Sequence, residues 1–259
     1  MEDQIDIQGL VQRSGNSFHS KVVAALKAKG WSTLISPYYN DSLTDKPREI
    51  DLLAEKAFPI THPFGDRRGA IAVRLFIECK YVPQATVFWF HDKDGARARQ
   101  LVLATTPMRD NNAYTDKHHY LRSNPSVAKL FASETKRDAE NEIMYKALNQ
   151  SLNALLYFRR GKPIITELSG GTPDYRATVN YPVILCNSLS RFYRVDMETD
   201  APPAQIETNF MLEVNYAYLD PNQTRKQEYF LIDVVEFGRL DDFLKCVQDD
   251  TDAMQVIVQ

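Results

Sequence analysis

The sequence is poor in three features that would each point to a particular class of protein: cysteine, glycine and long apolar runs. Its three cysteines, Cys79, Cys186 and Cys246, are odd in number and widely spaced, which excludes a disulfide framework or a cysteine-based zinc site. Ten glycines in 259 residues are too few for a fibrous chain. No apolar run approaches the ~18–20 residues that cross a bilayer, so we expect no membrane protein. The acidic start lacks the apolar segment of a secretory signal, and we expect a cytoplasmic protein.

The chain instead has the composition of an ordinary globular protein, with 44% apolar and 25% charged residues and a net charge of −3. The charge is uneven, because residues 91–165 carry 13 basic and 8 acidic side chains whereas residues 166–259 carry 7 and 16. A basic middle section permits a surface that faces nucleic acid, although uneven solvated faces produce the same pattern. Since no internal repeat or composition break marks a linker, we predict one α/β domain.

Hydrophobic periodicity predicts an alternation of helices and strands. Residues 16–29 carry apolar side chains at helical spacing, and Gly30 is placed to end that helix. Residues 70–81 form the most strand-like run of the first half, because β-branched and aromatic side chains dominate it. We predict further strands at 31–36, 48–54, 85–91, 100–105 and 181–186, a hairpin of 209–219 with 228–237, and helices at 125–133, 138–158 and 240–247.

Three ionisable side chains lie at the ends of two of these apolar strands. Asp51 closes one of them, and Glu78 and Lys80 lie two residues apart near the end of the next, so they share a face. Burying two carboxylates and an ammonium is costly unless another charge balances them. A divalent cation such as Mg²⁺ does so, since it takes one or two carboxylates together with phosphate oxygens and water. Without a metal the two carboxylates repel each other, so we expect one to titrate unusually high.

At this point the sequence resembles a known family, the PD-(D/E)xK nuclease superfamily, and most closely its restriction-endonuclease-like, Mrr-type branch. The resemblance rests on a helix, a strand, a strand ending in Pro47-x3-Asp51, a strand ending in Glu78-x-Lys80, and a later helix and strand. This order of helices, strands and strand-end residues is the pattern of that family.

The resemblance covers residues 14–90 and, more loosely, residues 138–190. It implies a restriction-endonuclease-like α/β fold with a mixed central β-sheet flanked by helices. The C-terminal β-hairpin and helix are expected from the residue pattern, and the C-terminal third has no counterpart in the family. The resemblance also implies a single nuclease-like domain over residues 1–259. Residues 91–137 have no counterpart in the family and are expected to be an insertion.

Carried over residue by residue, the resemblance implies that Asp51 and Glu78 bind catalytic Mg²⁺, for which Mn²⁺ is a possible substitute. The main-chain carbonyl of Cys79 would be a further metal contact, and Lys80 would assist the attacking water. One departure concerns the first helix, where many relatives have a Glu after an aromatic residue but this chain has His19. His19 either lies near the metal or is a surface residue, and the number of metals stays open.

A later helix offers one more candidate. Lys146, Gln150, Asn153 and Tyr157 form a polar stripe at helical spacing. Gln150 and Tyr157 resemble a glutamine-and-tyrosine helix motif of some branches, with different spacing, so Gln150 is a candidate catalytic residue. A solvated helix face explains the stripe equally well.

The implied function is a Mg²⁺-dependent endonuclease that hydrolyses phosphodiester bonds, most readily in DNA, by metal-activated water. By analogy with the family, restriction, phage defence or repair would be its role, and a homodimer is a possible assembly. The alternative is a catalytically inactive module of the same fold that binds nucleic acid or protein. Candidate phosphate contacts are the basic residues Arg97, Arg99, Lys117, Arg122, Lys136, Arg137, Arg159, Arg160 and Lys162.

Two other motifs are weaker. His118 and His119, near Asp116, could suggest a metal site, but an adjacent pair in a loop is more often exposed to solvent. The glycine-rich stretch at 169–172 is not followed by a lysine, so a phosphate-binding loop is not indicated.

Overall fold

The computed structural model describes residues 15–61, 67–110, 112–122, 125–133, 143–163 and 174–258, together with Gly9. Within these ranges ten strands form one sheet in the order β1-β4-β5-β8-β12-β11-β7-β6-β9-β10, and β2 and β3 form a separate hairpin. The strands are β1 (Ser32–Ile35), β2 (Tyr38–Asn40), β3 (Pro47–Glu49), β4 (Leu52–Thr61), β5 (Arg67–Lys80), β6 (Thr86–Asp92), β7 (Ser126–Ser133), β8 (Tyr175–Cys186), β9 (Phe192–Asp196), β10 (Ala204–Gln205), β11 (Phe210–Leu219) and β12 (Arg225–Glu236).

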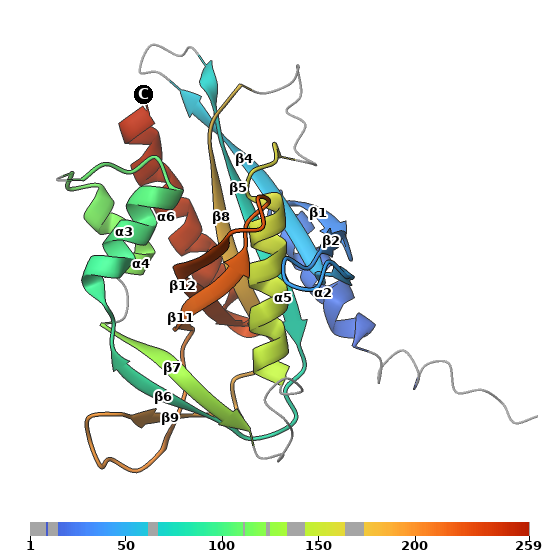
Figure 1. Ribbon diagram of the computed structural model, residues 1–259, viewed down its shortest axis with the longest axis vertical. Helices are drawn as coiled ribbons and strands as arrows, with labels where there is room; N and C mark the ends of the chain where they lie inside the picture. The colour runs from blue at the N-terminus through green and yellow to red at the C-terminus, as the bar shows by residue number, and fades with distance from the viewer. Residues whose placement is uncertain are drawn as a thin grey trace, which may run out of the picture.

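Helices cover both faces of this sheet (Figure 1). Helix α5 lies on one face, and α2 and α6 lie on the other, where α3 and α4 pack beside α6. The α/β class with a mixed central sheet flanked by helices is therefore confirmed. No helix in the described ranges has the length and apolar character needed to span a membrane. The helices are α2 (Asn16–Ala28), α3 (Gly95–Thr105), α4 (His119–Arg122), α5 (Ile143–Phe158) and α6 (Leu240–Val258), with 3₁₀ turns η1 (Thr115–Lys117) and η3 (Phe237–Arg239).

The half of the sheet that carries the candidate site has a simple connectivity. Strands β1, β4 and β5 are antiparallel neighbours, and β5 pairs in parallel with β8. A parallel pair needs a crossover connection, and α5 lies in the connection between β5 and β8. β6 and β7, which belong to the segment between β5 and α5, extend the same sheet on its other side through β7 and β11.

Helix α2 packs against the sheet and ends at a glycine. Val22 and Leu26 are fully buried against the sheet. After the helix, Gly30 adopts a φ of 77°, and the N–H of Trp31 donates to the carbonyl of Leu26 at 3.1 Å. This Schellman-type end requires a left-handed residue, which glycine supplies without strain. The predicted helix at 16–29 is thus confirmed, and its glycine ends it as expected.

Several sequence-based predictions were wrong in secondary structure. Residues 100–105 are helical rather than a strand, because the side chain of Asp94 caps α3 by accepting the N–H of Arg97 at 3.0 Å. Residues 126–133 are strand β7 rather than a helix, since they pair with β6. The strand predicted at 48–54 is broken at Ile50 and Asp51, where the chain leaves the β2–β3 hairpin and enters β4.

A cluster of buried polar side chains joins α4 and α6 to the sheet. The ring of His119 lies between two carboxylates: its Nδ1 contacts Asp250 Oδ2, and its Nε2 is 3.4 Å from Asp233 Oδ2. Burial acts to lower the pKa of His119, but the two carboxylates outweigh it and raise the pKa to about 10. His119 is therefore a buried imidazolium. We call this group the histidine cluster; its members are His118, His119, Tyr120, Tyr181, Asp233 and Asp250.

The expectation that the adjacent histidines face solvent was wrong. Both rings are buried and stack with their centroids 5.0 Å apart. Burial lowers the pKa of His118 to about 3, so this ring is neutral, and its Nδ1 accepts the N–H of Tyr120 at 3.2 Å. The partners that bury the pair, Asp233 and Asp250, lie more than a hundred residues away in the sequence.

Replacing His119 with alanine should lower the free energy of unfolding by about 3–5 kcal/mol, because Asp233 and Asp250 then stay buried without their shared counter-charge. Urea denaturation at pH 7 measures the loss. His91→Ala, which removes a side chain that is 21% exposed, is the matched control and should cost far less. A loss below about 1 kcal/mol for His119→Ala would contradict the imidazolium assignment.

Candidate metal and catalytic site

Asp51 and Glu78 hold each other in place through backbone hydrogen bonds. Asp51 lies in the break between β3 and β4, and Glu78 lies near the end of β5. The N–H of Asp51 donates to Glu78 Oε1 at 3.2 Å, and the N–H of Cys79 donates to Asp51 Oδ2 at 2.8 Å. Each carboxylate accepts a hydrogen bond from the other residue's segment, which fixes the two groups side by side.

Lys80 lies beside both carboxylates, as the sequence predicts. Its Nζ donates to Glu78 Oε2 at 2.6 Å and lies 3.6 Å from Asp51 Oδ2. The exposed fraction of the side chain is 0% for Glu78, 17% for Lys80 and 22% for Asp51. The three side chains therefore converge at one place that opens to solvent on the side of Asp51.

The titration of these groups follows from burial and from their mutual charges. Burial raises the pKa of Glu78 to about 8, an effect that the Lys80 ammonium reduces and the Asp51 carboxylate increases. Glu78 is thus the carboxyl with the expected raised pKa, but the main cause is desolvation rather than repulsion. Burial acts to lower the pKa of Lys80, yet Glu78 and Asp51 outweigh it and raise that pKa. Lys80 is an ammonium at neutral pH, which suits it to stabilise negative charge.

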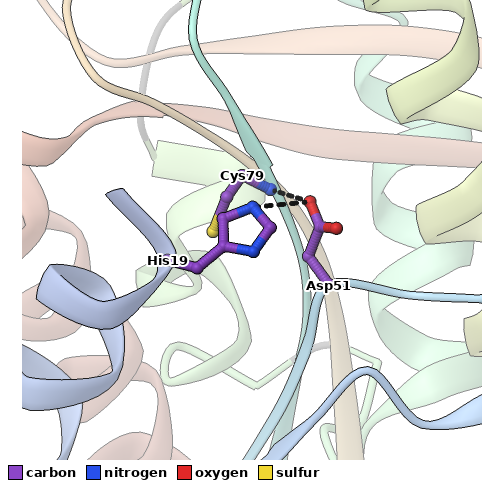
Figure 2. Close-up of side chains that lie close together, drawn as sticks. All are labelled: His19, Asp51 and Cys79. Atoms are coloured by element: carbon purple, nitrogen blue, oxygen red, sulfur yellow. Dashed lines mark hydrogen bonds and ion pairs between the residues drawn. The ribbon is translucent and has the colours of Figure 1, made fainter. Parts of the chain in front are cut away.

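His19 faces the Asp51 carboxylate (Figure 2). It lies in the first turns of α2, and its Nε2 is 3.5 Å from Asp51 Oδ2. The neighbouring Phe18 packs edge-on against Phe237 with ring centroids 5.6 Å apart, which anchors this end of the helix. The sequence left open whether His19 lies near the carboxylates or on the surface, and the structure places it beside Asp51.

The residues present fit a divalent cation. Asp51 and Glu78 offer carboxylate oxygens, and burial raises the pKa of the fully buried Glu78, a cost that a bound cation would relieve. Cys79 points its N–H toward Asp51, and in an antiparallel ladder the carbonyl of a residue points to the same neighbour as its N–H. Its carbonyl is thus on the side of the carboxylates, whereas burial keeps the pKa of its thiol well above the ordinary value. The carboxylate and carbonyl oxygens would suit Mg²⁺, and the imidazole of His19 would also suit Mn²⁺.

Gln150 does not reach the carboxylates directly. Its Nε2 donates to the carbonyl of Glu49, two residues before Asp51, at 3.3 Å. In the same stripe, the buried Asn153 donates to Asp41 Oδ2 at 3.3 Å. The middle of the stripe therefore holds the β2–β3 hairpin against α5, and Gln150 is placed as a positioning residue for the segment that carries Asp51.

Several of the predicted phosphate contacts are engaged within the protein. Arg99 pairs with Asp110 and Asp116, Arg122 with Asp249, and Arg159 with Glu228. An arginine held in this way has less of its charge available to a phosphate. Other candidates, Lys136 and Arg137 and the glycine-rich stretch at 169–172, lie outside the described residues.

The histidine cluster is a second group with atoms close enough to share a metal, namely His118, His119 and Asp250. However, Nδ1 of His118 accepts the N–H of Tyr120, so the proton of this neutral ring is on Nε2, the atom that faces Asp250. Both nitrogens of His119 face carboxylates as donors. The hydrogen bonds of this cluster are complete without a metal, and we assign it a structural role.

No family model, no curated protein and no solved structure matches this chain. The function is therefore argued from the geometry of the site.

The raised pKa of Glu78 makes metal-free stability depend on pH. A carboxyl whose pKa is raised from 4.5 to about 8 by folding binds its proton more tightly in the folded state, so its contribution is lost as the pH rises between these values. In EDTA, the free energy of unfolding of wild type should fall from pH 5 to pH 8 relative to Glu78→Gln, in which this group cannot titrate. Urea denaturation across this range measures both proteins, and parallel profiles would contradict the prediction.

Gln150→Ala should lower the free energy of unfolding by about 0.5–1.5 kcal/mol, the usual worth of one hydrogen bond. Because the lost bond supports the segment before Asp51, the affinity of the site for Mn²⁺ should also fall, as titration calorimetry would show. Lys146→Ala, on an exposed position of the same helix, is the control and should change neither quantity. Unchanged Mn²⁺ affinity in Gln150→Ala would remove this residue from the site.

Proposed function

We propose that this protein is a metal-dependent nuclease that hydrolyses phosphodiester bonds, with DNA as its substrate. The observation that carries the proposal is the convergence of Asp51, Glu78 and Lys80 at one partly open position, with both carboxylates fixed by backbone hydrogen bonds. Unlike the histidine cluster, this group is partly open to solvent at Asp51 and Lys80, and burial raises the pKa of Glu78 to about 8.

The connectivity also supports the proposal. Helix α2, strands β1, β4 and β5, helix α5 and strand β8 follow the order of elements on which the PD-(D/E)xK resemblance rests. The acids and the lysine lie at the end of β5 and at the entry to β4, as that resemblance implies. A restriction-endonuclease-like core, extended by the segment from β6 to β7, is the fold that we infer.

Each side chain then has a distinct task. Asp51, Glu78 and the carbonyl of Cys79 would hold the cation, which when bound polarises a phosphoryl oxygen and lowers the pKa of its water. The Lys80 ammonium, held by Glu78, stabilises the negative charge that develops on the phosphate. His19, beside Asp51 at the rim, is placed to bind the cation or to orient a phosphate oxygen.

The decisive experiment compares cleavage by wild type, Asp51→Asn and Lys80→Ala on plasmid and oligonucleotide DNA, with Mg²⁺ and with Mn²⁺. Loss of about 3 kcal/mol of transition-state stabilisation corresponds to a fall of about 100-fold, which we expect for each variant. Asp45→Asn, in the exposed turn of the β2–β3 hairpin, is the matched control and should cut at the wild-type rate.

If Asp51→Asn and Lys80→Ala cleave DNA as fast as wild type does, these residues do not carry the reaction. No cleavage by any of the proteins, together with binding of DNA, would favour the alternative of an inactive binding module. Thermal unfolding of each variant in EDTA verifies that a loss of activity is not a loss of fold.

A further inference from the structure

The thiol of Cys79 has no task in the function proposed above, although it lies close to Asp51. Side chains alternate between the two faces of the sheet along β5, so Glu78 and Lys80 lie on the face that α5 covers. Cys79 lies on the other face, where it shares a buried cluster with residues of α2, the helix that carries His19. A thiol and an imidazole therefore meet the Asp51 carboxylate on the face opposite to Glu78.

His19, Asp51 and Cys79 each bring a metal-ligating atom to the same place (Figure 2). A ring nitrogen, a carboxylate oxygen and the sulfur all lie within 4.8 Å of one another, and Nε2 of His19 is 3.5 Å from Oδ2 of Asp51. Two ligands of one tetrahedral zinc ion lie about 3.3–3.8 Å apart. The nitrogen and the oxygen already have this separation, and the sulfur needs a shift of no more than about 1 Å to reach it.

The exposure of the three side chains suits an ion that can exchange with solvent. Cys79 is 5% exposed, whereas the side chains of His19 and Asp51 are 24% and 22% exposed. The sulfur thus lies at the inner end of the group, and the imidazole and the carboxylate reach solvent. Three protein ligands and one open side form a tetrahedral site whose fourth position is taken by water.

The donor atoms select a thiophilic cation. Mg²⁺ takes oxygen ligands, whereas a thiolate together with an imidazole and a carboxylate is a donor set of Zn²⁺. On binding, the thiol of Cys79 would release its proton to solvent and the thiolate would form the metal–sulfur bond. The spacing of the cysteines excludes a zinc site made of cysteines alone. Here a single thiol suffices, because α2 and the connection between β3 and β4 supply the other two ligands.

We infer that His19, Asp51 and Cys79 form a Zn²⁺ site on the face of the sheet opposite to Glu78 and Lys80. The inference does not depend on the proposed nuclease activity, because the three ligands alone define the site. The two sites share Asp51, whose Oδ2 is also 3.6 Å from Nζ of Lys80. They differ in the remaining ligands, so substitutions can test them separately.

Co²⁺ is the probe for this site, because it occupies zinc sites and its bond to a thiolate gives a charge-transfer band in the near ultraviolet. We expect the full chain, stripped with EDTA and dialysed, to show this band with Co²⁺ and to lose it when Zn²⁺ is added. Cys79→Ser should abolish the band. His19→Ala should weaken Zn²⁺ binding by about 100-fold or more, since losing a residue that only supports a metal ligand already costs about 10–100-fold.

Two controls separate this site from the rest of the protein. Cys246→Ser removes a partly exposed thiol on α6 and should keep both the band and the Zn²⁺ affinity. Glu78→Gln removes the carboxylate on the opposite face of β5 and should also keep the band. Thermal unfolding in EDTA verifies the fold of each variant. If Cys79→Ser does not fold, His19→Ala decides, because it removes a partly exposed side chain.

The inference is wrong if wild type gives no charge-transfer band with Co²⁺, if the band persists in Cys79→Ser, or if His19→Ala binds Zn²⁺ like wild type. A band that disappears in Cys246→Ser or in Glu78→Gln would place the metal elsewhere and overturn the inference as well. The expected spectra without any cleavage of DNA would leave this site standing while the nuclease proposal fails. Metal-dependent cleavage without the Co²⁺–thiolate band would do the reverse.

Discussion

The reciprocal hydrogen bonds between Asp51 and the end of β5 are the interaction on which the site depends. Asp51 lies between β3 and β4, outside both strands. Its N–H donates to the side chain of Glu78 instead of to a backbone carbonyl of a neighbouring strand. The Asp51 carboxylate in turn accepts the N–H of Cys79. Two backbone donors that would be costly to bury unpaired are thus satisfied by two acids. The contacts that hold the segments together also place carboxylate oxygens where a cation would need them.

The two polar clusters of the molecule differ in how their charges are balanced. In the histidine cluster, one imidazolium lies between two carboxylates, deep in the protein, with its hydrogen bonds complete. In the site, one ammonium, Lys80, faces two carboxylates, burial raises the pKa of Glu78, and the group is open to solvent at Asp51. A bound cation would relieve the cost of burying this acid, whereas a closed network has no such cost to relieve. This contrast separates the cluster that stabilises the fold from the one that we propose as a cation site.

The sequence was sufficient for the parts that local patterns specify. β-Branched and aromatic residues located β5, and the alternation of apolar residues located β11. Helical spacing and Gly30 located α2, and the spacing of Glu78 and Lys80 placed them on one face. The strand wrongly predicted at 100–105 had a local signal, the Asp94 cap of α3, but the other failures depended on distant partners. Residues 126–133 became a strand because β6 pairs with them, and the break at Asp51 depends on Glu78, 27 residues later. The burial of His119 depends on Asp250, 131 residues later, so no local signal could show it.

The order of strands in the sheet has a consequence for how the protein is made. β4 and β5 are neighbours in the sequence and pair in the sheet, whereas the other neighbour of β5, β8, ends about a hundred residues later. At ordinary rates of translation the long apolar edge of β5 is bare for roughly 5–20 s. Charged residues discourage such an edge from joining another chain, and β5 carries Arg74 in its middle, opposite Glu55 of β4. In the folded protein Arg74 and Glu55 are fully buried, but on the nascent chain their charges would oppose aggregation through this edge.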